Sequence, residues 1–249
     1  MSELLKEKRC LIMEIMEIIK DAAMYPINNV KALVIYVALM IVAVLALIFT
    51  GVGFIGASEA SGAAAGGLGI LGIIGIIIAL AIVILIAGYM LDVIKIAVNR
   101  EDGAPEIDPQ RQIINGLKLI VLAFIYMIIP IIVMALLSAI NEYLAIIGII
   151  LLIVFAVLLV IAQCRLAKTE SLGEALNFGE VIGDIKEIGI VKVVLVLILV
   201  GIIGYILTLI AGGIGQFSEI IGSILTAIFS IYVTFFENRA YGLLYSDAE

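Results

Sequence analysis

The sequence predicts an all-α, polytopic membrane helical bundle with six transmembrane helices and both termini in the cytoplasm. Sixty-five per cent of its 249 residues are hydrophobic and only 14% are charged, whereas a soluble domain has about 25% charged residues. The mean hydropathy is +1.33. The apolar residues also fall in runs of about twenty, the length that a helix needs to cross a bilayer.

The basic residues give the orientation of the helices. All 14 lysines and arginines lie in the N-terminal segment, in residues 95–118, in residues 165–192 or at Arg239. The loops expected on the opposite side, residues 51–67, 138–142 and 212–218, contain none. Because short cytoplasmic loops are rich in lysine and arginine, we expect the N- and C-termini to be cytoplasmic.

The first element is an amphipathic helix over residues 3–23. Leu4, Leu11 and Ile18 recur every seven residues, while the acidic side chains lie away from that stripe. This helix is too charged to span, so we expect it in the membrane interface or packed on another helix. Pro26 is expected to end it. The predicted organisation is an N-terminal interfacial helix at 1–26, a six-helix domain at 27–242 and a cytoplasmic tail at 243–249.

Six crossings are predicted at about residues 31–53, 68–89, 113–137, 143–162, 188–211 and 217–236. A loop of small residues at 56–67 separates the first two. A polar hinge with Pro105 and Pro109 joins the second to the third, and lipid cannot satisfy its free backbone amides. Residues 163–187 predict a second interfacial helix, around Glu170 to Phe178. The pattern also suggests three repeated helical hairpins, although positive-inside flanks alone account for it.

The composition argues against an enzyme. The chain has no histidine, which excludes imidazole-based triads and the usual zinc sites. The sequence also lacks a phosphate-cradling glycine motif, a nucleophile elbow and a basic aromatic patch. We therefore expect no catalytic, cofactor or metal residues and no nucleic-acid partner. Cys10 and Cys164 are expected to be reduced thiols on the cytoplasmic side.

Charged residues close to membrane helices form the first candidate site, a cytoplasmic polar cluster. Asp92 and Lys95 lie one helical turn apart, where they can pair. Glu237, Asn238 and Arg239 lie at the inner end of the sixth predicted helix. The competing interpretation is that these side chains extend to the lipid headgroups.

A hydroxyl stripe on the sixth predicted helix forms the second candidate site. Ser223, Thr226, Ser230 and Thr234 are spaced by three or four residues, so they share one helical face. Such a face is able to line an aqueous path. Serine and threonine on membrane helices more often pack against a neighbour or bond to their own helix.

Four glycines at the start of the second predicted helix form a third candidate, a packing edge. Gly66, Gly69, Gly72 and Gly75 leave room for another backbone, either within the bundle or between protomers. Pro130 removes a hydrogen bond in the third predicted helix and favours a kink there.

Three stretches resemble an archaeal membrane family, the domain of unknown function 4013. They are Tyr25-Pro26, Pro105-Glu106-Ile107-Asp108 with Asn115-Gly116-Leu117-Lys118, and Asn238-Arg239-Ala240-Tyr241-Gly242. Ile107 and Gln110 depart from the family, which usually has aromatic residues there. The resemblance implies a six-helix protein of the archaeal plasma membrane with no established activity. It also implies contact with membrane lipid, through a distant similarity to membrane domains attached to glycerophosphodiesterases.

Two functions follow as hypotheses. The first is a non-catalytic structural, assembly or accessory subunit of a plasma-membrane complex, in a homo-oligomer or with a membrane-protein partner. The alternative is a small transporter or channel whose path follows the hydroxyl stripe. The first is preferred, because transporters of polar solutes usually have a polar midplane site or a broken helix.

Overall fold

The computed structural model describes residues 2–59, 61–215 and 219–248, and within these ranges the chain is helical with no strand. Five of its helices are long and apolar enough to cross a membrane: α2, α3, α4, α5 and α8. The all-α membrane class predicted from the sequence is therefore confirmed. The helices are α1 (Ser2–Asn28), α2 (Val30–Glu59), α3 (Ala63–Val98), α4 (Pro109–Ile140), the 3₁₀ turn η1 (Glu142–Leu144), α5 (Ala145–Thr169), α6 (Leu172–Ala175), α7 (Phe178–Ile188), α8 (Ile190–Gly215) and α9 (Glu219–Tyr245).

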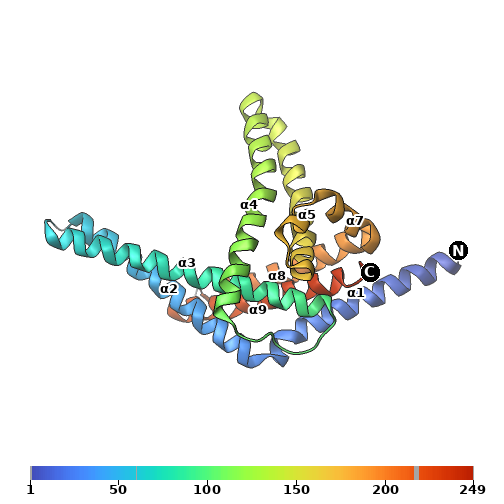
Figure 1. Cartoon of the computed structure of the whole chain (residues 1–249), viewed down its shortest axis with the longest axis horizontal. Coiled ribbons are helices and arrows are strands. Elements are labelled where there is room, and N and C mark those ends of the chain that lie inside the picture. Colours follow the sequence, from blue (N-terminus) through green and yellow to red (C-terminus); the bar gives the residue numbers. More distant parts are fainter. Residues whose placement is uncertain (1, 60, 216–218, 249) are drawn as a thin grey trace.

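The long helices pack as three antiparallel hairpins, α2–α3, α4–α5 and α8–α9. Figure 1 shows the α2–α3 hairpin extending to the left and the α4–α5 hairpin extending upward. The hairpins meet at one end, where α3 contacts α4, α5 and α9. We call this end the polar base: α1, residues 99–108, α6, α7 and the adjoining ends of the hairpins.

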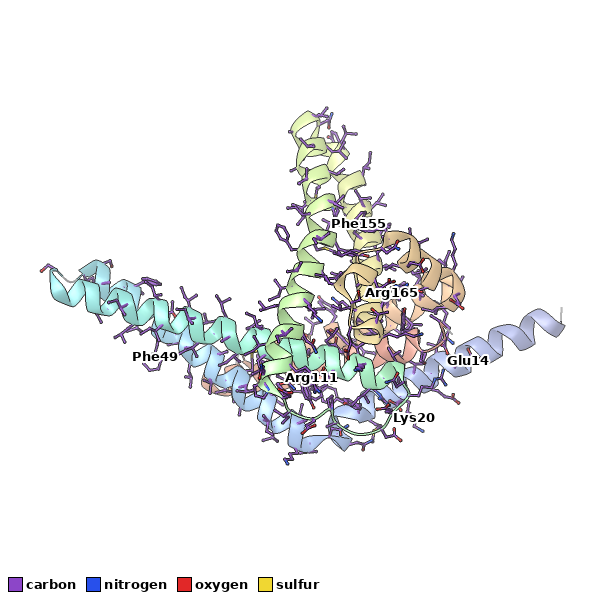
Figure 2. The ribbon with its side chains drawn as sticks, in the orientation of Figure 1. Glu14, Lys20, Phe49, Arg111, Phe155 and Arg165 are labelled. Atoms are coloured by element: carbon purple, nitrogen blue, oxygen red, sulfur yellow. The ribbon has the colours of Figure 1, made fainter. Side chains whose placement is uncertain are left out.

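The buried core lies mainly at the polar base. Its larger cluster joins α1, α3, α4, α5, α7, α8 and α9, and a smaller cluster joins α2, α3 and α9 around Tyr36 and Tyr89. The outer parts of the hairpins expose apolar side chains, such as Phe49 of α2 (Figure 2), which is 69% exposed. The helices of the predicted bundle therefore pack together mainly at the base, whereas the outer parts of the α2–α3 and α4–α5 hairpins diverge (Figure 1).

Local sequence explains where α4 begins. Asp108 caps the helix, since its Oδ1 accepts hydrogen bonds from the backbone N–H groups of Gln110 and Arg111. Pro109 is the first helical residue, where a missing N–H costs nothing. Of the two hinge prolines, Pro109 therefore begins the third predicted crossing, and α4 continues without interruption through Pro130.

Two predicted interruptions between helices differ in position or length from the prediction. The prediction that Pro26 ends the first helix is wrong: α1 continues to Asn28, and the chain turns at Asn29. The Asn29 side-chain amide and backbone N–H both donate to the Tyr25 carbonyl, which completes the last turn. The small-residue loop predicted at 56–67 is also mostly helical, since α2 runs to Glu59 and α3 begins at Ala63.

The second interfacial helix is also displaced from its predicted position. The α5 helix extends to Thr169, and residues 170–177 contain only the short α6. The amphipathic helix is α7, which Asn177 caps and which turns Val181 and Ile188 toward the core. The positive φ of Gly189, +98°, separates α7 from α8.

The predicted tail is part of the folded base. The α9 helix runs to Tyr245, and Leu244, Tyr245 and Ala248 are buried in the larger cluster. The α1 helix packs on α8 and α9, so both terminal segments belong to one structural unit with the hairpins.

The predicted glycine edge is divided between two environments. A Cβ atom at Gly75 would meet the backbone oxygen of Ala46 at 2.6 Å, and one at Gly72 would meet the Phe54 ring at 3.2 Å. These two glycines therefore bring α3 close to α2 within the hairpin, where Thr50 donates a hydrogen bond to the Gly72 carbonyl. Gly66 faces open space, and Gly69 approaches only the Cβ atom of Ala57, at 4.0 Å.

Candidate functional site

The polar base carries three networks of charged side chains, and the first joins α3 to α4. The Asp92 carboxylate accepts hydrogen bonds from Arg111 Nη2 and Asn115 Nδ2, both at 3.1 Å. Asp92 is 7% exposed. A buried carboxylate needs such partners, because an unpaired charge away from water is costly.

The α3 and α4 backbones approach each other closely at two glycines, and this approach positions the network. A Cβ atom at Gly88 would lie 1.7 Å from the Gln112 carbonyl oxygen, and one at Gly116 would lie 2.0 Å from the Ile84 carbonyl oxygen. The two backbones therefore cross almost in contact. Asp92, one turn beyond Gly88, faces Arg111 and Asn115 across this crossing.

An aromatic cluster continues the α3–α4 junction toward α2. Gln112 is fully buried; its Oε1 accepts a hydrogen bond from Tyr36 Oη at 3.0 Å, and its Nε2 donates to the Glu106 carbonyl. The Tyr36 ring stacks on the Tyr89 ring with 4.2 Å between centroids, and Phe235 of α9 packs against both. These contacts join four helices, α2, α3, α4 and α9, which belong to all three hairpins.

The second network is centred on Arg165 near the end of α5. Its guanidinium contacts Asp184 of α7 at 2.9 Å, and Glu174 and Glu180 at 3.1 Å each. Tyr245 of α9 donates to the same Asp184 carboxylate at 2.8 Å. Burial, with Asp184 nearby, raises the pKa of Tyr245. Arg165, labelled in Figure 2, therefore ties α6 and α7 to the end of α5.

The third network joins the two ends of the chain. Lys192 of α8 pairs with Glu14 of α1 at 2.8 Å and with Asp247 at 2.9 Å, and Asp247 also pairs with Arg100 at 2.7 Å. Arg239 of α9 pairs with Asp21 of α1 at 2.8 Å and donates to the Glu101 carbonyl at 2.7 Å. The Arg239 guanidinium also lies over the Tyr25 ring, 5.0 Å from its centroid.

A cavity of about 230 Å³ lies between α3, the hinge, α4 and the end of α5. Lys95, Arg111 and Lys118 contribute three cations to its lining, and Asp92, Glu106 and Glu170 contribute three carboxylates. Lys95 pairs with Glu170, and Lys118 Nζ donates to the Glu170 carbonyl at 3.0 Å. Lys95 lowers the pKa of Glu170, with smaller contributions from Lys118 and Arg111.

The predicted cytoplasmic cluster is not one site. Asp92 and Lys95 share a face of α3 but pair with different partners, Arg111 and Glu170. Arg239 belongs to the terminal network, and Asn238 donates to the Thr234 carbonyl of its own helix. The Glu237 carboxylate lies against Gly204 of α8, where a Cβ atom would be 2.9 Å from its Oε1. The five residues are thus distributed over separate contacts.

The hydroxyl stripe lies on the side of α9 away from the core. Thr226 and Ser230 are exposed, while Ala227, Ile231 and Phe235 face inward. Thr234 donates to the Ser230 carbonyl at 2.7 Å, as hydroxyls in membrane helices often do. The side chain of Ser223 lies outside the described residues. Use of this stripe as a path stays a prediction.

Sequence reasoning missed the residues that organise the base. Arg111, Gln112, Arg165 and Asp184 were not selected, because each lies in a segment read only as a loop or a flank. A polar residue one helical turn from a glycine, as Gln112 is from Gly116, is a sequence signal that could have indicated a buried polar contact at a helix crossing. Among the residues that the structure describes, no group of three His, Cys, Asp or Glu side chains is arranged to hold a metal ion.

Comparison with known proteins gave one family. A family model described as "Protein of unknown function (DUF4013)" matches residues 75–216, more than half of the chain. The matched part runs from within α3 to the end of α8, and so includes the hinge, the cavity and the Arg165 network apart from Tyr245. No match was found among curated proteins or among solved structures.

Proposed function

This chain belongs to the DUF4013 family of proteins of unknown function, and we propose that it is a non-catalytic assembly protein of the plasma membrane of an archaeon. In this proposal six helices cross the membrane, because α9 contains most of the apolar run predicted at 217–236 and adds a sixth helix to the five that are long and apolar enough to span. The polar base lies in the cytoplasm. This orientation is supported by the concentration of lysine and arginine at the base and by the position of both terminal helices there (Figure 1).

The divergence of the hairpins is the observation that carries the assembly role. The α4–α5 hairpin reaches the other two through α3 and α9 at the base. Farther out, α5 exposes Ile146, Ile149 and Ile150, and α8 exposes Ile202, Tyr205 and Ile206. Apolar faces of diverging arms are available to helices of another copy of the chain or of a partner protein.

Ion pairs join many helices of the base, which suits a scaffold. Its cations and carboxylates pair with one another across α1, α3, α4, α5, α7, α8 and α9. The alternative function is a small transporter or channel. In a single copy of the chain the hydroxyl stripe does not line an internal path, because Thr226 and Ser230 lie on the exposed side of α9. In an assembly the same stripe would face a neighbouring copy.

Native mass spectrometry of the tagged protein, purified in mild detergent, tests the proposal. We expect a homo-oligomer or a stoichiometric second polypeptide. Gly66→Leu should reduce the assembled fraction at least several-fold, because Gly66 faces open space on the outer part of α3 and glycines there permit close helix approach.

Gly183→Leu is the matched control for this experiment. Gly183 also faces open space, but it lies on α7 at the base, so its substitution should leave assembly intact. A monomer both in mild detergent and in lipid nanodiscs would overturn the assembly role. Assembly that is unaffected by Gly66→Leu would exclude this part of α3 from the interface.

A further inference from the structure

The cavity at the α3–α4–α5 junction is lined by three cations and by three carboxylates, one of which, Glu170, is held by an exposed ion pair with Lys95. Lys95 of α3 and Arg111 and Lys118 of α4 all line it. Arg111 already has Asp92 as a buried partner. Among the described residues Lys118 forms no ion pair, and its Nζ donates only to the Glu170 carbonyl. Lys95 and Lys118 thus both contact Glu170, Lys95 through the carboxylate and Lys118 through the backbone carbonyl.

Glu170 is held in an unfavourable backbone conformation. It follows the last residue of α5 with a φ of +56°, in the left-handed region that disfavours residues with a side chain. Glycine is the usual residue at such a helix end. A glutamate at this position places a carboxylate beside Lys95. Lys95, with smaller contributions from Lys118 and Arg111, keeps the pKa of that carboxyl below its ordinary value.

The Glu170 carboxylate is also easy to displace. The Lys95 and Glu170 side chains are 45% and 66% exposed, and ion pairs this exposed add little to stability because water and salt screen them. Glu170 can turn toward water without leaving a charge buried. Lys95 would then lose its carboxylate partner and would face the cavity together with Lys118, while Arg111 keeps its pair with Asp92.

We propose that this cavity binds a phosphate group and that Glu170 occupies the site in its absence. A singly charged phosphodiester would replace a singly charged carboxylate, so the local charge would be unchanged. Arginine and lysine are the usual phosphate partners, and a cavity of about 230 Å³ far exceeds the space that one water needs.

The position of the cavity favours a lipid headgroup as the source of the phosphate. Leu91, Ile96 and Leu166 form its apolar wall, and it lies where α3 and α4 leave the apolar arms. Basic pockets between membrane helices on the cytoplasmic side are known to bind anionic headgroups. A soluble phosphate compound has the same recognition chemistry, so the experiment separates the two sources.

The test is lipid binding to the delipidated full-length protein, measured by native mass spectrometry in a neutral detergent. Phosphatidylglycerol is titrated, with diacylglycerol as the comparison lipid that lacks a phosphate group. We expect Lys118→Gln to weaken phosphatidylglycerol binding about ten-fold, since a charge-assisted hydrogen bond is lost. We expect Glu170→Gln and Glu170→Gly to strengthen it, because both remove the competing carboxylate. Glycine also relaxes the backbone at this position.

Lys186→Gln and Glu187→Gln are the matched controls, because both residues lie on α7 outside the cavity lining. Circular dichroism melts establish that each variant is folded. Competition by millimolar inorganic phosphate would identify a soluble ligand, and its absence a lipid headgroup. Equal affinities for the two lipids without phosphate competition, or Glu170 and Lys118 variants that bind like the controls, would overturn the proposal.

Discussion

Tyr36 and Tyr89 stack in one aromatic cluster but differ at their hydroxyl groups. Tyr36 Oη donates to the buried Gln112 side chain, whereas Tyr89 Oη is buried without a hydrogen-bond partner among the described residues. A buried polar group with no partner loses its hydration and gains nothing in return. At the scale of single residues, the same side chain therefore stabilises the cluster at one position and not at the other.

Phenylalanine substitutions test this difference. Tyr36→Phe should lower the free energy of unfolding by about 1–3 kcal/mol, since it leaves Gln112 Oε1 buried and unpaired. Tyr89→Phe keeps the ring and removes an unpaired hydroxyl, so stability should be unchanged or higher. The measurement is SDS titration of the detergent-solubilised protein followed by circular dichroism. Equal losses in the two variants would contradict the assignment of the hydrogen bond.

At the scale of helices, glycine decides where two elements touch. Gly88 and Gly116 permit the α3–α4 crossing, Gly72 and Gly75 the α2–α3 hairpin, and Gly242 the contact of α9 with α3. In each case a Cβ atom would meet backbone or Cβ atoms of the other helix, or a ring packed against it, at close range. Helices in lipid lack a hydrophobic driving force toward each other, so close backbone packing replaces it.

Alanine at Gly88 should separate α3 from α4. Its Cβ atom would lie 1.7 Å from the Gln112 carbonyl oxygen, so the helices must move apart, at a cost of about 3 kcal/mol or more. The Asp92–Arg111 pair should be lost with the crossing. Gly67→Ala is the control on the same helix, because nothing lies within 4 Å of its Cβ position. Thermal melts by circular dichroism compare the two, and a stable Gly88→Ala protein would rule out the close crossing.

At the scale of the whole molecule, the terminal network ties the first helix to the last. Arg239 and Lys192 are buried cations, and their carboxylate partners come from α1 and from residues 102 and 247. The pairs therefore join segments of the chain that are far apart in sequence. Because a buried cation depends on its partners, α1 is held in place by charge as well as by its apolar stripe.

Two arginines of this network should differ strongly when changed to glutamine. The Arg239 side chain is 3% exposed, and its substitution should lower the free energy of unfolding by about 3–5 kcal/mol and make α1 sensitive to protease. The Arg100 side chain is 65% exposed, so Arg100→Gln should cost less than about 1 kcal/mol. Limited proteolysis and SDS titration measure both effects. A protected α1 in Arg239→Gln would show that apolar packing and the Lys192–Glu14 pair hold it without Arg239.

The sequence by itself determined the class of this protein, the positions of the apolar helices and the segregation of basic residues. These features are local: a run of apolar residues predicts a membrane helix wherever its neighbours lie. The four glycines of α3 also look alike in the sequence. Only their packing separates Gly72 and Gly75, which touch α2, from Gly66, which faces open space.

Only the tertiary structure decided which charges pair and how the hairpins are arranged. Spacing along α3 predicts that Asp92 pairs with Lys95, but Asp92 turns to Arg111 and Lys95 to Glu170. Asp21 and Arg239 are 218 residues apart in the chain and still form one ion pair. Such partners depend on how whole helices cross, and the crossings depend on close contacts between distant glycines and backbones. No local pattern contains that information.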